Sequence, residues 1–391
     1  DGHMAFANSK AMQLAGVDAK TISPEGGVIV KNQKGELTGC FKDGAMSLID
    51  KVIPQPTEAE LDEYYKAAAQ YALERGVTHV NDMGSYGGWA DLATYRRIAE
   101  KNNSMIRMYA FMPLSTWSKL DSFVQKNGRG DDMVKWGGLK GYVDGSLGST
   151  TAWFHQPYLD DPKSTGLTIT DTTDLRNWVK GADKAGLHVA VHAIGDRAND
   201  FILSVYADAA KTNGNRDRRF RVEHAQHVRL AAIENFANQH VIASMHPYHL
   251  VDDGIWAYKR LDTSRLKGTY AIKNMMNDGV TVTFGSDWPV APVDALFGIY
   301  AAVTRRTGDN KNPNGWYPDQ KISVDDALRA YTVNNAFASF MENKIGILKS
   351  GCYADFAVLD QDLHTIDPSA IKDVKVSLTV LNGKEVYKRK Q

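Results

Sequence analysis

Seven short apolar segments, separated by stretches with helical periodicity, dominate the sequence between residues 77 and 284. Short runs rich in β-branched residues are typical of buried strands. Their alternation with helical stretches favours parallel β–α–β units over an antiparallel sandwich, so we expect an α/β fold. The predicted strands are 77–82, 106–112, 139–143, 188–192, 221–224, 241–245 and 280–284.

The stretches between these strands carry helix signals. Thr57 and Glu60 form a capping box that begins a helix, and Gly76 lies just beyond its end. Near the start of the chain, residues 5–16 are predicted to form an amphipathic helix that ends at Gly16. Further helices are predicted over 89–100, 174–185, 196–210, 231–238, 264–277 and 324–341.

The number of strands indicates the type of barrel. A closed (β/α)8 TIM-like barrel needs eight parallel strands, and we expect the missing first strand to lie before Asp1. Residues 1–335 would form this barrel, including an N-terminal insertion segment. Residues 336–391 would form the C-terminal part of a small β-sandwich, in which Asn382 and Gly383 predict a hairpin turn.

Composition excludes several classes of partner. The chain has 46 basic and 46 acidic residues, so its zero net charge argues against a nucleic-acid partner. No apolar run approaches the roughly 20 residues that span a bilayer. Cys40 and Cys352 are too few for a disulfide framework. The first residues show no targeting segment, so we expect a cytoplasmic protein that acts on a small molecule.

Four polar residues lie at the carboxyl ends of predicted strands, or just beyond them. They are Lys140, His192, His224 and Asp287. In a parallel barrel these ends converge on one face, where the active site lies. Imidazole and carboxylate groups suit zinc or a similar divalent ion, so the pattern predicts a metallohydrolase.

Two of the residues in this region have alternative interpretations. A lysine inside an apolar strand is costly unless it is neutralised or paired. Lys140 could therefore carry a carbamate that binds metal through oxygen, or it could remain unmodified and pair with Asp144 or Asp287. Glu223 points to the opposite side of its strand from His224, so a structural ion pair is as plausible for it as a contact that orients the ligand.

Seven phrases along the chain resemble the amidohydrolase superfamily, in the branch of N-substituted formamide deformylase-like metal-dependent hydrolases (amidohydrolase family 3). They are DGHMAFANSKAMQLAG, VDGSLGS, PYLDDP, VHAIGDRAN, RVEHAQ, GSDWPV and GILKSGCYADFAVLD. The resemblance implies that His192 and His224 bind metal, and that Asp287 touches the metal and shuttles a proton. It also implies a carboxylated Lys140 between two metals, and a possible homodimer. One departure is that no His-x-His pair, which the family places on its first strand, occurs in this sequence.

We therefore expect one or two divalent ions, zinc first, and hydrolysis of a carbon–nitrogen bond in a non-peptide amide or formamide. A metal-activated hydroxide would attack the carbonyl, with Asp287 as proton shuttle and His246 or His249 stabilising the oxyanion. The alternatives are a metal-poor relative that only binds a ligand, and an esterase or phosphoesterase on the same barrel. The residues expected to contact the substrate are Asp1, His3, Asp144 and Trp288.

Overall fold

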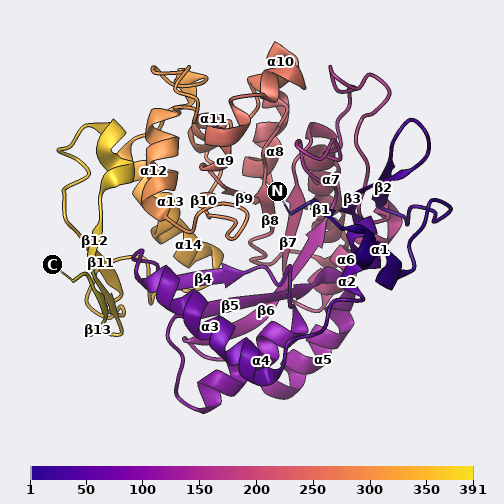
Figure 1. The fold of residues 1–391 in the computed structure, drawn as a ribbon. Helices are drawn as coiled ribbons and strands as arrows, with labels where there is room; N and C mark the ends of the chain where they lie inside the picture. Colours follow the sequence, from indigo (N-terminus) through magenta and orange to yellow (C-terminus); the bar gives the residue numbers. More distant parts are fainter. Residues whose placement is uncertain (1, 391) are drawn as a thin grey trace.

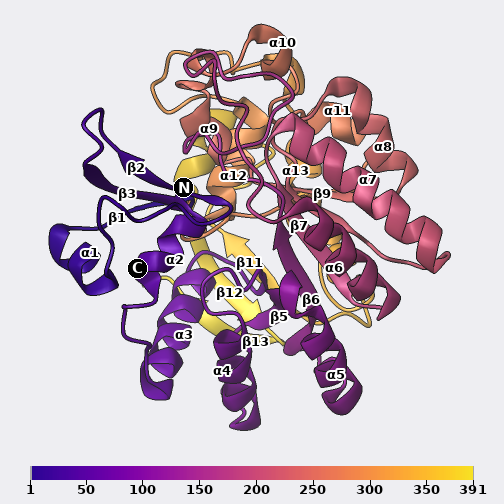
Figure 2. The ribbon, with the colours of Figure 1, turned by 90° about the vertical axis from the view of Figure 1, so that its right-hand side faces the viewer.

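The centre of the fold is a curved, parallel, seven-stranded sheet with helices on its outer face (Figures 1 and 2). The structure is a computed structural model that describes residues 2–390. Each strand lies beside its predecessor in the chain, which confirms the predicted TIM-like arrangement, and β4 and β10 form the two edges. The strands are β4 (His79–Asp82), β5 (Arg107–Pro113), β6 (Val134–Tyr142), β7 (His188–Ala193), β8 (Arg221–His224), β9 (Ile242–Met245) and β10 (Val282–Phe284).

Most of the outer helices lie where the sequence predicts them. Thr57 caps α3 through both bonds of the capping box, with Glu60 as its partner. The matching helices are α3 (Glu58–Leu73), α4 (Trp89–Glu100), α6 (Thr172–Lys184), α7 (Asp196–Asn213) and α8 (Ile233–Asn238). The longest helices that were not predicted are α5 (Trp117–Asn127) and α12 (Ala295–Thr304). The residues of α12 are apolar on nearly all sides, so the helix has no amphipathic stripe that marks it in the sequence.

Two long predicted helices are each divided in two. The first is divided into α10 (Thr263–Leu266) and α11 (Ile272–Asn277), because the backbone between them pairs with the segment after β8. The amide of Val228 donates to the carbonyl oxygen of Gly268 at 3.0 Å, and the amide of Tyr270 donates to that of Gln226 at 2.8 Å. The second is divided into α13 (Val324–Tyr331) and α14 (Val333–Ala338). The side-chain amides of Asn334 and Asn335 there donate to carbonyl oxygens of β10, both at 2.8 Å.

The N-terminal residues form a separate antiparallel sheet beside the barrel (Figure 2). The helix predicted over residues 5–16 was wrong at its start, because Met4–Phe6 is strand β1 and α1 (Ser9–Ala15) begins only after Asn8. The side chain of Asn8 accepts a hydrogen bond from the amide of Ala11, which fixes the start of α1. The N-terminal lobe, as we call it, comprises β1, α1, β2 (Gly27–Lys31), β3 (Leu37–Asp43) and α2 (Ser47–Asp50).

The C-terminal unit is a second antiparallel sheet, at the opposite side of the barrel (Figure 1). It contains β11 (Phe356–Leu359), β12 (Val376–Leu381) and β13 (Lys384–Lys388). Asn382 and Gly383 both have positive φ, as the predicted hairpin turn requires. The division into domains at residue 335 stays a prediction. Among the described residues, no helix is long and apolar enough to cross a membrane.

Candidate metal centre

The sheet order brings the predicted polar residues together at the carboxyl ends of neighbouring strands. β6 carries Lys140, β7 carries His192 and β8 ends at His224, and these three strands are neighbours. The segments that follow the next two strands, β9 and β10, carry His246 and Asp287. Residues that are separated by up to 147 positions therefore meet because parallel strands place their carboxyl ends on one face.

The imidazoles of this region form a continuous row. Ring centroids are 4.5 Å apart between His192 and His224, 4.7 Å between His224 and His246, and 5.5 Å between His246 and His249. Potential ligand atoms of His224, His246 and Asp287 all lie within 4.8 Å of one another. His246 is thus one of the potential metal ligands, and its expected action on the substrate stays a prediction. His192 adjoins this group through His224.

Burial favours the neutral form of three of these imidazoles, those of His192, His224 and His249. Burial, followed by the charges of His3 and Lys140, holds the pKa of His192 well below its usual value. The pKa of His224 is likewise well below its usual value, because of burial first and then the neighbouring His192 and His246. Burial lowers the pKa of His249 to about 4. Neutral imidazoles keep a nitrogen lone pair, which is the form that binds a metal.

Three buried ring nitrogens in the centre have no hydrogen-bond partner among the described residues. They are Nδ1 of His224, Nδ1 of His246 and Nε2 of His249. Leaving a buried polar atom unpaired is costly, and such atoms need an explanation. A divalent ion would satisfy the nitrogens of His224 and His246, and imidazoles together with the carboxylate of Asp287 form a set of donors that suits zinc. These residues therefore fit a metal.

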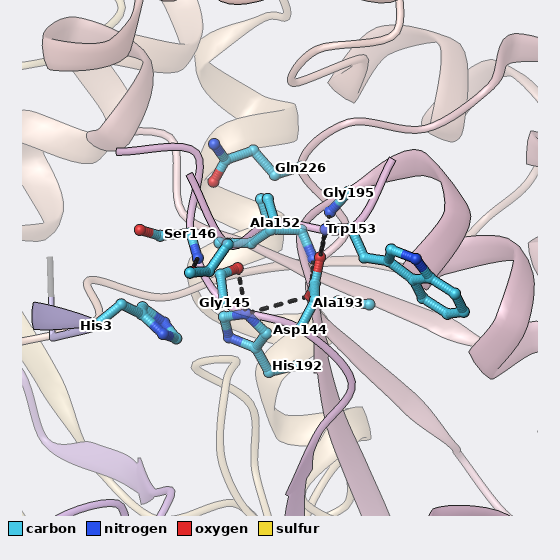
Figure 3. Close-up of polar contacts among 12 residues, drawn as sticks. His3, Asp144, Gly145, Ser146, Ala152, Trp153, His192, Ala193, Gly195 and Gln226 are labelled. Carbon is cyan, nitrogen blue, oxygen red and sulfur yellow. Dashed lines mark hydrogen bonds and ion pairs between the residues drawn. The ribbon is translucent and has the colours of Figure 1, made fainter. Parts of the chain in front are cut away.

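A network around Asp144 holds His192 in place (Figure 3). The Nε2–H of His192 donates to the carbonyl oxygen of Gly145 at 3.1 Å, and Nε2 lies 3.5 Å from Oδ1 of Asp144. Because Nε2 carries the proton, Nδ1 of His192 is the nitrogen that can act as a ligand. The network thus selects one tautomer of this imidazole.

Asp144 itself is enclosed. Its carboxylate accepts backbone amides from Trp153 at 2.7 Å, Ile194 at 3.0 Å and Gly195 at 2.8 Å, and its side chain is fully buried. Burial raises its pKa to about 7, although the three amides act in the opposite direction. Since both oxygens accept these amides, the geometry gives Asp144 a role in positioning loops, and the expected substrate contact stays a prediction.

Lys140 is buried beside the row of imidazoles, and it has no ion pair with any residue that the structure describes. Its Nζ lies 4.2 Å from the centre of the Tyr142 ring. The alternative pairing with Asp144 or Asp287 is therefore absent. Glu223, by contrast, forms a buried ion pair with Nε of Arg221 at 2.7 Å, which is the structural link that the sequence analysis left open.

The remaining predicted residues lie at the edge of the centre. Oδ2 of Asp287 is 3.6 Å from Nε2 of His249. Trp288 is 44% exposed and stacks on Tyr71, with ring centroids 5.8 Å apart. The His3 ring lies 4.9 Å from that of His192. Asp1 lies outside the described residues.

The backbone is strained at two of the candidate ligands. His224 has φ of 73° and Asp287 has φ of 58°, in the left-handed region that non-glycine residues rarely adopt. Strained residues of this kind cluster at functional sites, where the surrounding structure holds them in place.

Two residues near the centre escaped the sequence analysis. Gly285 lies against the imidazole of His246, and its only signal was its place in the GSDWP phrase. Asp43 lies against His3, 40 positions away in the chain, and no local pattern marks that contact.

Comparison with known proteins identifies the family. A model described as the amidohydrolase family matches residues 1–387. The chain belongs to the amidohydrolase family. It is 40% identical to the protein LONG AFTER FAR-RED 3 of Arabidopsis thaliana, over 99% of this chain and 68% of that protein. It is 25% identical to N-substituted formamide deformylase of Arthrobacter pascens, over 99% of this chain and 72% of that protein.

A solved structure shares the fold. It is that of an uncharacterized metal-dependent hydrolase from Pyrococcus horikoshii, with a TM-score of 0.77 and 28% identity over 94% of this chain and 71% of that chain. This amidohydrolase family member is therefore a hydrolase with a TIM-like barrel, and its His224, His246 and Asp287 form a candidate metal site.

Proposed function

We propose that the protein is a metal-dependent hydrolase of a carbon–nitrogen bond in a small non-peptide amide or formamide. The observation that carries this proposal is the cluster of His224, His246 and Asp287, whose potential ligand atoms lie within 4.8 Å of one another. The deformylase relative supports the type of bond, and the metal-dependent hydrolase from Pyrococcus supports the use of a metal.

The side chains present would hold one or two divalent ions, of which zinc is the first candidate. His192 through Nδ1, His224, His246 and Asp287 are the proposed ligands, and Lys140 would join them if it carried a carbamate. When bound, such an ion supplies Lewis acidity that polarises a carbonyl and activates water near neutral pH.

The chain's own residues would supply proton transfer and orientation. Asp287 is the only carboxylate in the cluster of candidate ligands within the described part of the chain, and its side chain remains 34% exposed. It can therefore accept a proton from the attacking water and return it to the leaving nitrogen. His249, 3.6 Å from that carboxylate, is placed to hydrogen-bond the carbonyl oxygen as charge develops there.

The test combines metal content with a matched set of substrates. Elemental analysis of purified protein should give about one or two equivalents of a transition metal. The metal-loaded protein should then hydrolyse N-substituted formamides or amides faster than esters and phosphoesters of the same shape. His224→Ala should remove both the metal and the activity, whereas His364→Ala, at an exposed histidine outside the centre, should remove neither.

Two results would contradict the proposal. Protein that binds no metal under any loading condition would indicate a binding role in place of catalysis. Metal-loaded protein that hydrolyses only esters or phosphoesters would support a metal-dependent hydrolase but contradict hydrolysis of a carbon–nitrogen bond.

A further inference from the structure

A histidine and an aspartate of the N-terminal lobe form a closely held pair. Nδ1–H of His3 donates to Oδ1 of Asp43 at 2.6 Å. The backbone amide of Asp43 donates to the carbonyl oxygen of His3 at 2.9 Å, next to the antiparallel pairing of β1 with β3. Two hydrogen bonds, one through the side chains and one through the backbone, therefore fix the orientation of the imidazole.

The pair lies beside the candidate metal centre. The centroid of the His3 ring is 4.9 Å from that of His192, and Figure 3 shows the His3 ring directed toward His192. Nζ of Lys42, the residue before Asp43, donates to the carbonyl oxygen of Ser149 at 2.5 Å. A Cβ on Gly145 would lie 2.9 Å from Oδ1 of Asp43, so the carboxylate also packs against the loop that holds His192. The lobe thus brings one imidazole to the edge of the site.

Asp43 is an unfavourable residue for its position if stability alone is considered. Its φ of 45° and ψ of −124° lie in a region that favours glycine. Its side chain is fully buried, and Oδ2 has no hydrogen-bond partner among the described residues. Backbone strain and an unpaired buried oxygen at one residue are typical of functional positions. The carboxylate contacts His3, so orienting His3 is the function that the geometry offers.

We propose that His3 and Asp43 form a substrate-orienting couple. His3 would hydrogen-bond a polar group of the substrate beside the scissile bond, and Asp43 would be the positioning residue that fixes the imidazole. This inference rests on the proposed function in one respect, since it requires a substrate bound at the row of imidazoles. It predicts that amides with a hydroxyl or amino group beside the scissile bond are preferred over matched amides with a methyl group in that place.

The decisive variant is Asp43→Gly, because glycine relieves the strained backbone and removes the carboxylate. If Asp43 served only the fold, Asp43→Gly would keep its activity and be at least as stable as the wild type. If Asp43 orients His3, kcat/KM should fall by roughly tenfold or more, which corresponds to losing one charge-assisted hydrogen bond. Cys40→Ala, at a buried residue on the same strand, is the control and should change neither metal content nor kcat/KM.

A double-mutant cycle separates a couple from two independent residues. His3→Gln should lower kcat/KM at least as much as Asp43→Gly, and the double variant should be no worse than His3→Gln alone, because Asp43 acts through His3. Asp43→Asn, which keeps the shape of the side chain, controls for damage to the lobe. Additive losses, or Asp43→Gly activity within about twofold of wild type, would overturn the proposal.

A binding measurement keeps this inference distinct from the proposed amide hydrolysis. Acetohydroxamic acid, a small metal-binding amide analogue, should bind the metal-loaded wild type and bind His3→Gln and Asp43→Gly roughly tenfold more weakly. That result would support the couple even if no amide were hydrolysed. Normal amide hydrolysis with unchanged variants would overturn the couple alone. Metal-loaded wild type that does not bind the probe would also overturn it.

Discussion

A Cβ on Gly285 would lie 2.9 Å from both Cε1 and Nδ1 of the His246 imidazole. This is closer than real Cβ atoms approach, so the ring could not keep its place beside any larger residue. Gly285 follows β10, and His246 follows the neighbouring strand β9. Because Gly285 has no side chain, the imidazole of His246, a candidate ligand after the neighbouring strand, can occupy this position.

Gly285→Ala should impair the metal centre and leave the fold intact. The φ of Gly285 lies outside the left-handed region, so alanine adds no backbone strain and acts only by displacing His246. A shift of this size can reduce kcat/KM by roughly tenfold to a hundredfold. Metal content, kcat/KM and Tm should be measured together. Gly308→Ala, where the added atom meets ordinary contacts of 3.5 Å or more, is the control and should behave as wild type.

The sequence was sufficient to predict the strands but not the roles of the residues at their ends. Strands β4 to β10 were predicted because a buried parallel strand is a short apolar run, which is a local property. The place of His246 depends on Gly285 across the sheet, and the contact of His3 with Asp43 joins residues 40 positions apart. Such contacts arise from the pairing of β9 with β10 and of β1 with β3, and neither pairing leaves a periodic signal.

Asp253→Asn should change how stability depends on pH. Asp253 accepts hydrogen bonds from Tyr270 at 2.6 Å and Gln226 at 2.9 Å, and burial raises its pKa from 3.8 to about 6. Because the folded state binds this proton more tightly, the contribution of Asp253 to stability is fully present below about pH 3.8 and is lost as the pH rises through about 6. The fall is at most about 3 kcal/mol, at about 1.4 kcal/mol per pKa unit.

Asparagine can still accept a hydrogen bond but does not ionise. The Tm of the variant should therefore rise relative to that of the wild type between pH 4 and pH 6.5. The measurement is Tm against pH for both proteins at constant ionic strength. Parallel curves would show that Asp253 does not titrate in this range.

Arg107→Met should destabilise the junction between the barrel and the C-terminal unit. Arg107 is 1% exposed, and its Nε donates to Oδ2 of Asp355 at 2.5 Å, while another nitrogen contacts Asn382. Removing one partner leaves a buried charge uncompensated, which typically costs about 3–5 kcal/mol. Tm should therefore fall, whereas metal content should not, because Arg107 lies at the start of β5, away from the strand ends that form the centre.

Two further variants show whether the lost charge is responsible. Asp355→Asn combined with Arg107→Met should recover part of the lost stability. Arg176→Met, which breaks an exposed pair with Asp208, should change Tm little. Equal losses from both arginine variants would contradict the role of burial.

Lys140→Met should lower the metal content and raise the stability of the metal-free protein. Lys140 is buried in β6 without an ion pair among the described residues, and burying an amine without such a partner is costly to the fold. In chelator-treated protein, methionine should therefore raise the free energy of unfolding by roughly 1–3 kcal/mol. Metal content and kcat/KM should fall. If Lys140 carries a carbamate, a carbamate carbon signal that appears after incubation with ¹³C-bicarbonate should be absent from the variant.

Lys135 provides a control on the same strand. It lies toward the start of β6, and its Nζ donates to the carbonyl oxygen of Ser339 at 2.7 Å, whereas Lys140 has only the Tyr142 ring and no ion pair among the described residues. Lys135→Met should consequently lower Tm, because it leaves that carbonyl unpaired, and should leave metal content unchanged. Lys140→Met protein with full metal content and full activity would remove Lys140 from the centre, and the ligands would then be limited to the row of imidazoles and Asp287.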